Sequence, residues 1–272
     1  MPYTNSPGRS IVELEVRYVG TLRIELFDRD KPASAKNFLR YVMENNYTNS
    51  LIHRSITNSI FQGGSLRIID FGGGSKAVVP VEEKPAVTNE LMTGGFFSNQ
   101  RGTIALAHYA GQTNVSTCHW FINLTNNSYL DVANTNNSYV VFGRVISGLE
   151  NLDKLNPGPT NTTIKILNLG GYLTDAPVKP TATVSTVSYD DLLTVNYRVI
   201  TLDMDLKVQR SGSNISVVSW RSVSNKQHTV SYTQPIGAAW TNLLTTNGNG
   251  ATQSFQHTNN SPSGFYRLQY QP

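Results

Sequence analysis

The first thirty residues alternate between apolar and polar side chains before the pattern changes to a helical one. Residues 11–19 and 22–27 alternate with a period of two, and a Gly-Thr pair separates them. This pattern predicts two antiparallel strands joined by a tight turn. Pro32 then precedes the stretch Ala33 to Glu44, whose apolar residues recur every three or four positions. That spacing predicts an amphipathic helix of about three turns.

Between this helix and residue 173, short apolar stretches with strand character follow one another. The stretch Gly148 to Leu155 has leucines three residues apart and predicts a second, shorter helix. The other stretches predict five strands, at residues 59–63, 102–108, 118–124, 139–145 and 164–169. A single sheet that closes on itself would bury their inner faces, so we expect a closed antiparallel β-barrel capped by two helices.

The pattern changes again after residue 173. Residues 174–186 contain several helix and strand breakers and no periodicity, so we interpret them as a linker. From residue 187 to 272, short strands recur about every ten residues without helical spacing, which predicts a β-sandwich. These strands are predicted at residues 192–202, 206–210, 215–220, 228–233, 253–257 and 265–270. We therefore expect a barrel domain over residues 1–173 and an accessory sandwich domain over residues 187–272.

Composition excludes several classes of protein. Of 272 residues, 39% are hydrophobic, which is enough to form buried cores and excludes a wholly disordered chain. A net charge of +4 is too small for a basic nucleic-acid surface, so we expect no nucleic-acid partner. Cys118 is the single cysteine and the five histidines are scattered, so we expect no disulfide, no metal and no cofactor.

The surface chemistry bears on location. Only 15% of residues are charged, and Asn, Thr and Ser supply most of the polarity, as is more common in exported bacterial proteins. No apolar run is long enough to span a membrane. We expect a monomer in the periplasm or outside the cell, with any leader removed before this numbering begins, while the cytoplasm stays open as an alternative.

Strand parity gathers chemically useful side chains onto one wall. Arg54, Ile60 and Gln62 share one parity along their strands, and His119 and Phe121 share another. Each set faces one side of its strand, so a cation, an amide and apolar surface would converge. Taken singly, Arg54 has an alternative role as a solvated or salt-bridged residue, and Phe121 has one as an ordinary core residue.

Four blocks of sequence occur in a recognisable order. They are Ile52 to Ile56 running into Phe61-Gln62-Gly63-Gly64, then Arg101 to Ala107, then His119 to Leu124 followed by Tyr129-Leu130-Asp131, and finally Val140 to Val145. In this order and spacing, the chain resembles the cyclophilins, the barrel-type peptidyl-prolyl isomerases, over residues 11 to about 173. Nothing comparable covers the rest of the chain.

The resemblance implies an enzyme that accelerates rotation about X-Pro bonds in unfolded or exported polypeptides, without a cofactor. It implies catalytic roles for Arg54, Gln62 and His119. The implied substrate-binding residues are Ser59, Ile60, Ala107, His108, Phe121, Tyr129, Leu130 and Tyr139.

The chain departs from the family's usual residues at four of these positions. The family usually carries an aromatic residue at Ser59, Gln at His119 and His at Tyr139. Tyr129 stands where cyclosporin-sensitive relatives have Trp, so we expect weak or no binding of cyclosporin. Two alternatives remain open. One is a proline-peptide-binding module with little turnover, and the other is a protein that binds glycan or cell envelope through its C-terminal domain.

Overall fold

A computed structural model describes residues 3–5, 10–109, 111–133, 138–156, 163–234, 238–259 and 264–270. The chain divides into two compact units, one formed by Ile11–Arg198 and the other by Met1–Ser10 with Val199–Pro272. Every candidate residue named above lies in the first unit. Among the described residues, no helix has the length and apolar character needed to cross a bilayer.

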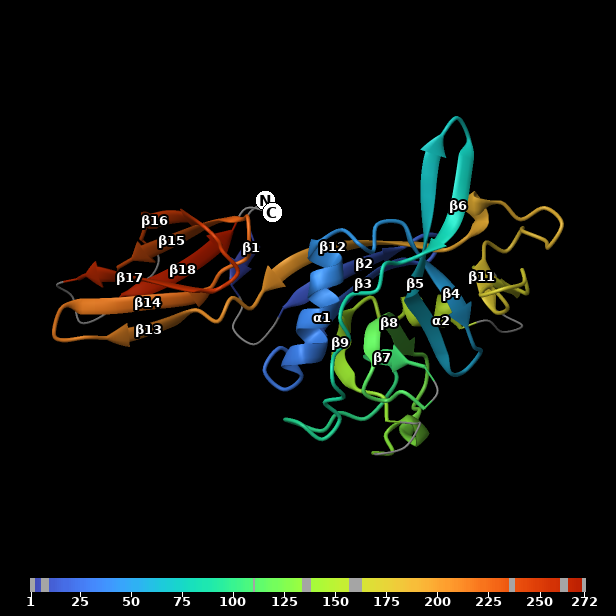
Figure 1. Cartoon of the computed structure of the whole chain (residues 1–272), viewed down its shortest axis with the longest axis horizontal. Coiled ribbons are helices and arrows are strands. Elements are labelled where there is room, and N and C mark those ends of the chain that lie inside the picture. Colours follow the sequence, from blue (N-terminus) through green and yellow to red (C-terminus); the bar gives the residue numbers. More distant parts are fainter. Residues whose placement is uncertain are drawn as a thin grey trace. The chain divides into compact units, whose positions relative to one another are not determined.

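The first unit contains a closed, eight-stranded antiparallel barrel (Figure 1). Each strand pairs with the next around the barrel, and the last pairs with the first. In that order the strands are β2 (Ile11–Val16), β3 (Gly20–Leu26), β9 (Val141–Ser147), β7 (Thr103–His108), β8 (Ser116–Asn123), β5 (Ile60–Gly72), β4 (Ser50–Ser55) and β12 (Thr194–Leu202). The predicted barrel is thus confirmed.

The strand that closes the barrel differs from the expected one. The stretch predicted at residues 164–169 forms β10 (Lys165–Leu167), which pairs with β11 (Ala176–Val178) rather than with the barrel. The edges of β2 and β4 are instead covered by the start of β12. The backbone N–H of Ile52 donates to the carbonyl of Leu193, and that of Arg17 donates to Thr194, both at 2.9 Å. The first unit therefore extends past residue 187, where we expected the second domain to begin, because open strand edges need a partner.

The segment expected to be a linker packs against the barrel. Val178 and Ala182 are buried in an apolar cluster with Leu51, Leu66 and Leu192. Within residues 174–186, β11 also has all three of its residues buried. Prolines in this stretch end helices and strands, but the stretch still contains enough apolar residues to pack against the barrel.

A long hairpin extends from one side of the barrel (Figure 1). Strand β5 continues to Gly72, far beyond the predicted end at residue 63, and turns into β6 (Ser75–Pro80), which we did not predict. Gly72, Gly73 and Gly74 all have positive φ at the turn. Glycine adopts this backbone conformation without the steric cost that a Cβ imposes.

The two predicted helices are confirmed. Helix α1 (Pro32–Met43) contacts β8 and β9, and α2 (Asn151–Leu155), three residues shorter than expected, contacts β3. Phe38 of α1 is fully buried among the rings of Tyr47, Trp120 and Phe142. Two 3-10 turns also occur, η1 (Ser128–Leu130) and η2 (Tyr189–Asp191).

The second unit consists of further β sheets. One sheet contains β13 (Lys207–Arg210), β14 (Ile215–Arg221) and β17 (Thr252–Thr258). The other strands are β16 (Thr241–Asn247), β15 (Gln227–Thr233), β18 (Phe265–Tyr270) and β1 (Tyr3–Asn5), paired in that order. His257 of β17 contacts the rings of Tyr232 and Tyr266, so the two sheets meet through side chains.

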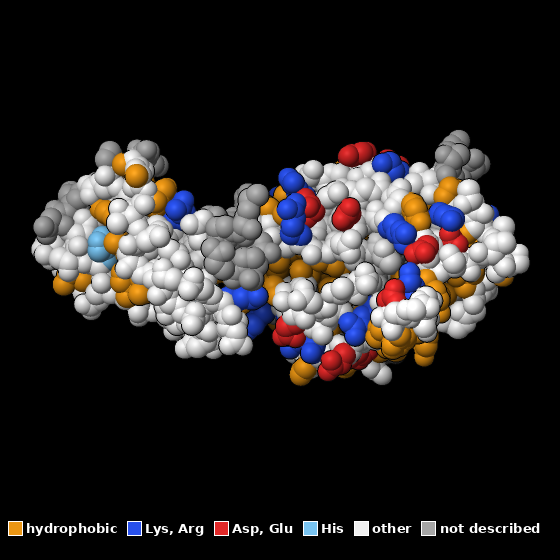
Figure 2. Space-filling view, turned by 90° about the horizontal axis from the view of Figure 1, so that it is seen from above, with side chains coloured by type: hydrophobic (Ala, Val, Ile, Leu, Met, Phe, Trp, Pro, Cys, Tyr) orange, Lys and Arg blue, Asp and Glu red, His pale blue; other side chains and the backbone are white. Residues whose placement is uncertain are grey.

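Charge is sparse on the molecule. On the face that Figure 2 presents, basic and acidic side chains are interspersed over the first unit, and few charged side chains lie over the second. This distribution agrees with the low charged fraction of the sequence.

Candidate functional site

Strand register brings Arg54, Gln62 and Phe121 side by side. Arg54 of β4 lies opposite Gln62 of β5, and Gln62 lies opposite Phe121 of β8. Phe121 in turn lies opposite Ala105 of β7, which pairs with Val141 of β9. Residues directly opposite on neighbouring strands project from the same face of a sheet. One row across five strands therefore presents a guanidinium, an amide and an aromatic ring together.

The two glycines that follow Gln62 allow β5 to lie close to β8. A Cβ built on Gly63 would lie 2.6 Å from the ring of Trp120, and one on Gly64 would lie 2.2 Å from the carbonyl oxygen of Cys118. Gly64 also has a φ of +88°. The Gln-Gly-Gly sequence thus lets β5 lie against the Trp120 ring while Gln62 keeps its place opposite Phe121.

An apolar cluster covers the Phe121 end of this row. Phe121 packs with Ala105, Ala107, Leu130 and Val141, all buried. Four partly buried residues pack against them, namely Phe27, Ile60, Phe97 and Tyr139. Five of the residues that we expected to bind substrate therefore meet in one cluster: Ile60, Ala107, Phe121, Leu130 and Tyr139.

Tyr139 links this cluster to Arg54 and His108. Its ring meets Phe121 edge-on at 5.5 Å and stacks on the His108 ring at 4.3 Å. Burial raises the pKa of Tyr139, and the positive charge of Arg54 opposes that change, as expected for a guanidinium near the hydroxyl. Arg54 thus lies at the edge of the apolar cluster.

His108 has one unused nitrogen. Its Nδ1 lies 3.0 Å from the carbonyl oxygen of Tyr109, and because a carbonyl only accepts, Nδ1 is the donor. Nε2 is buried and has no hydrogen-bond partner among the described residues.

A hydrogen-bonded loop positions Tyr129 and Leu130. The Asp131 carboxylate, directly after η1, accepts hydrogen bonds from Ser98 Oγ and from the backbone and side-chain N–H groups of Asn99. Leu130 is held in the apolar cluster, whereas Tyr129 is exposed, with its hydroxyl 3.4 Å from Ser59 Oγ. Ser59 therefore meets the site through Tyr129 and lies outside the apolar cluster.

Arg54 is engaged in a weak ion pair. Its Nε lies 3.5 Å from Oδ2 of Asp175, with 43% of the Arg54 side chain and 45% of the Asp175 side chain exposed. Solvent screens such a pair, and its use of Nε leaves the two terminal guanidinium nitrogens for another partner. Arg54 is therefore half exposed to solvent even though it forms this ion pair.

His119 lies apart from the apolar cluster. Its Nε2 is 3.5 Å from Oε1 of Glu83 and 3.5 Å from the Tyr109 hydroxyl, and its ring meets His53 at 6.5 Å. Burial lowers the pKa of His119, and Glu83 opposes that change. The imidazole is therefore neutral at pH 7.

Four residues near the site were not found by sequence reasoning. Phe27 and Phe97 stack at 4.1 Å and pack on the apolar cluster, Asp175 pairs with Arg54, and Glu83 faces His119. Phe27 ends an alternating stretch, which was a usable signal. The other three lie in irregular segments, where no periodicity assigns a facing side.

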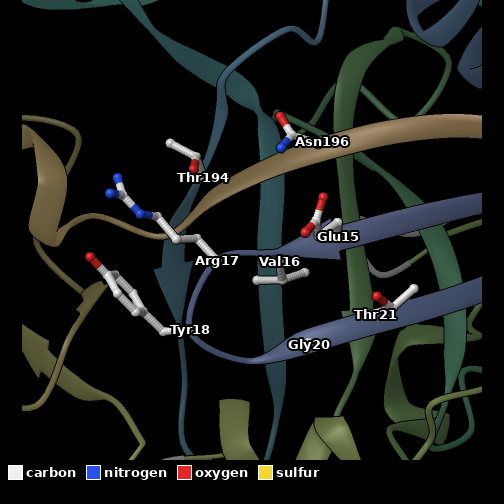
Figure 3. Close-up of a pocket in the computed structure, with 8 residues that line it drawn as sticks. All are labelled: Glu15, Val16, Arg17, Tyr18, Gly20, Thr21, Thr194 and Asn196. Carbon is white, nitrogen blue, oxygen red and sulfur yellow. The ribbon is translucent and has the colours of Figure 1, made fainter.

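A separate pocket lies at the turn between β2 and β3. It measures about 480 Å³, and Figure 3 shows Glu15 of β2 and Asn196 of β12 lining it from neighbouring strands. Two of the side chains that line this pocket already have partners. Arg17 pairs with Asp190 at 3.4 Å, and the Tyr18 hydroxyl donates to the Asp190 carbonyl. None of the candidate residues lines this pocket.

Comparison with known proteins gives matches to peptidyl-prolyl isomerases of the cyclophilin type. The sequence model described as cyclophilin type peptidyl-prolyl cis-trans isomerase/CLD matches residues 11–181. A peptidyl-prolyl cis-trans isomerase of Acinetobacter baylyi is 34% identical over 158 residues, which cover 57% of this chain and 76% of the relative. Peptidyl-prolyl cis-trans isomerase A of Dickeya dadantii is 33% identical over 161 residues, covering 59% and 75%.

A solved structure is also similar. It is a cyclophilin type peptidyl-prolyl cis-trans isomerase of Cryptosporidium parvum, crystallised in the presence of the dipeptide Ala-Pro. The match covers 71% of this chain and 99% of that chain, with 21% sequence identity and a TM-score of 0.46.

Proposed function

Since the chain belongs to the cyclophilin-type peptidyl-prolyl cis-trans isomerase family, we propose that it accelerates X-Pro rotation at the face formed by Arg54, Gln62 and the apolar cluster around Phe121. The observation that carries this assignment is the strand register. It sets a half-exposed guanidinium opposite Gln62, and Gln62 opposite the ring of Phe121.

The reaction needs no covalent step. Rotation about an X-Pro bond crosses a barrier of about 18–20 kcal/mol because amide resonance is lost at the twisted geometry. At that geometry the prolyl nitrogen becomes pyramidal and gains a lone pair. A guanidinium N–H that donates to this lone pair binds the transition state better than the planar amide, which lowers the barrier. Arg54 is the proposed donor.

The remaining residues would bind and orient the peptide. Ile60, Phe121, Leu130 and Tyr139 offer apolar surface for the five-membered ring of proline. Gln62, opposite Arg54, is suited to hold the peptide backbone and the guanidinium together. The His108 ring stacks on Tyr139 at 4.3 Å and would hold that ring in place beside the substrate.

The decisive test replaces Arg54. Arg54→Ala should lower kcat/KM on an Ala-Pro peptide by about 100-fold, the usual effect of removing one donor to transition-state charge. Arg17→Ala is a matched control, because Arg17 is 40% exposed and pairs with Asp190 at 3.4 Å. That variant should keep its activity within about twofold of the unchanged chain. Equal rates for the unchanged chain and Arg54→Ala, both matching the uncatalysed rate, would contradict the proposal and favour a peptide-binding module. Equal rates above the uncatalysed rate would remove Arg54 from the proposed mechanism.

The aromatic residue at position 129 bears on inhibition. Tyr129 is exposed beside Ser59, and its ring carries a hydroxyl where an indole N–H would donate to cyclosporin. We expect cyclosporin to inhibit the isomerase weakly, and Tyr129→Trp to strengthen inhibition by about tenfold, the equivalent of one added hydrogen bond. Inhibition curves for both proteins check this, and nanomolar inhibition of the unchanged chain would contradict it.

The substrates that we propose are unfolded or exported polypeptides, met in the periplasm or outside the cell. The support is compositional, since charged residues make up only 15% of the chain. We also propose that nucleic acid is not a partner, since basic and acidic side chains are interspersed on the face that Figure 2 presents. Cell fractionation with an antibody against the chain tests the location, and light scattering tests the expected monomer.

A further inference from the structure

Three metal-ligand side chains meet beside the proposed active face. They are the Glu83 carboxylate, the Cys118 thiol and the His119 imidazole, whose ligand atoms all lie within 4.8 Å of one another. Cys118 and His119 are consecutive on β8, and Glu83 comes from the irregular segment between β6 and β7. A sulfur, a nitrogen and an oxygen from two distant segments thus converge.

The spacing of these atoms is close to that around a small ion. Tetrahedral zinc with Zn–N and Zn–O near 2.1 Å and Zn–S near 2.3 Å holds its ligand atoms about 3.3–3.6 Å apart. The separation of His119 Nε2 from Glu83 Oε1 is already 3.5 Å. The other two pairs lie within 4.8 Å, so each would need to close by at most about 1 Å. Glu83 can supply movement for its own pairs, because it lies on an irregular segment and 43% of its side chain is exposed.

A neighbouring side chain holds the carboxylate in place. The Tyr109 hydroxyl lies 3.3 Å from Glu83 Oε1, where it can orient the carboxylate.

We propose that Glu83, Cys118 and His119 bind one divalent transition-metal ion of the zinc class, with a fourth position left for water. Thiolate and imidazole ligands favour zinc, cobalt and their neighbours, whereas magnesium and calcium prefer oxygen ligands. This proposal differs from our expectation of no metal site. That expectation considered the spacing of residues along the sequence, and Glu83 reaches the other two only through the fold.

Cobalt is the probe of choice because the chain has a single cysteine. Any thiolate-to-cobalt charge-transfer band in the near ultraviolet must therefore arise from Cys118. Titration of the metal-free full chain with Co²⁺ should produce this band, saturate at one ion per chain, and lose the band when Zn²⁺ is added.

Variants separate this site from adventitious binding. Cys118→Ser should abolish the charge-transfer band, while His119→Gln and Glu83→Gln should each weaken Co²⁺ binding by about tenfold or more. Glu82→Gln, which removes the neighbouring exposed carboxylate, is the matched control and should leave binding unchanged. If Cys118→Ser fails to fold, Glu83→Gln still decides, since Glu83 is exposed. A band that is absent with excess Co²⁺, or that responds equally to Glu82→Gln and Glu83→Gln, overturns the proposal. These outcomes do not depend on isomerase activity, so they are separate from the Arg54 test.

Discussion

Burial makes protonation less favourable for four of the five histidines. The pKa values of His53, His119, His228 and His257 are all lowered by burial. His53 is the extreme case, with a pKa lowered from 6.5 to about 3 by burial and by the nearby His119 and Arg54. As the pH falls below 6.5, His53 becomes protonated in the unfolded chain but stays neutral in the folded chain. The folded state therefore loses stability relative to the unfolded state. The loss grows until the pH reaches about 3, where folded His53 also becomes protonated.

His53→Gln should weaken this acid sensitivity. In the unchanged chain, His53 alone should lower the free energy of unfolding by about 1.4 kcal/mol for each pH unit between pH 6 and 4. Glutamine can still hydrogen-bond to Ser65 Oγ, as His53 does at 3.0 Å, but does not titrate. Urea unfolding at pH 6, 5 and 4 should show a shallower pH dependence in the variant. Parallel curves for the two proteins would show that His53 is protonated in the folded state.

Strand parity predicted the facing side of some site residues but not of all. Arg54, Gln62 and Phe121 lie on regular strands and share one row, as we expected. His119 has the same parity as Phe121 but lies apart from the apolar cluster, next to Glu83. Asp175 and Glu83 were beyond this reasoning, because each lies in an irregular segment whose position depends on packing elsewhere in the chain. The sequence placed Ser59 near the start of a strand, but it did not predict the contact between Ser59 and Tyr129. That contact depends on how η1 folds.

Strand β12 is the element whose role in the barrel was least evident from the sequence pattern. Its alternation predicted a strand, but nothing local indicates that its first half pairs with β4. Tyr197 of this strand stacks on Tyr47 at 5.0 Å and meets Phe38 at 6.2 Å, while its hydroxyl lies 3.0 Å from Ser50 Oγ. The strand therefore supplies part of the barrel's aromatic core as well as backbone pairing.

Tyr197→Ala should consequently destabilise the barrel. The loss of a largely enclosed ring should lower the free energy of unfolding by about 3 kcal/mol, and Tyr197→Phe, which removes only the hydroxyl contact, by about 1 kcal/mol. Tyr172→Ala is the control, because Tyr172 is 83% exposed, and it should change stability by less than about 0.5 kcal/mol. Thermal and urea unfolding measure all three. A Tyr197→Ala variant as stable as Tyr172→Ala would show that the Tyr197 ring contributes little to the core.

For the whole molecule, two boundaries disagree. The family match ends at residue 181, whereas the first compact unit continues to Arg198. Every proposed active-site residue lies within Ile11–Arg198, so catalysis should need nothing outside this unit. In contrast, β12, which covers the edges of β2 and β4, begins after residue 181. A chain limited to the family-matched range would therefore leave the barrel open.

Two shortened chains test this difference. A chain of residues 11–198 should unfold cooperatively and keep kcat/KM within about twofold of the full chain. A chain of residues 11–181 should lack cooperative unfolding, because β4 and β2 lose their shared neighbour. Circular dichroism and the Ala-Pro assay compare the two. A folded, active 11–181 chain would show that β10 or another segment can replace β12.

The late position of the closing strand also has a consequence for biosynthesis. Leu51 pairs with Thr194, so these partners are separated by most of the length of their own unit. Such non-local pairing slows folding, because a long loop must be ordered before the contact forms. A ribosome must therefore release nearly all of this unit before the nascent barrel can shut, and until then its two unpaired edges are exposed to chaperones or to other nascent chains. This prolyl isomerase would therefore itself fold through an intermediate with open strand edges.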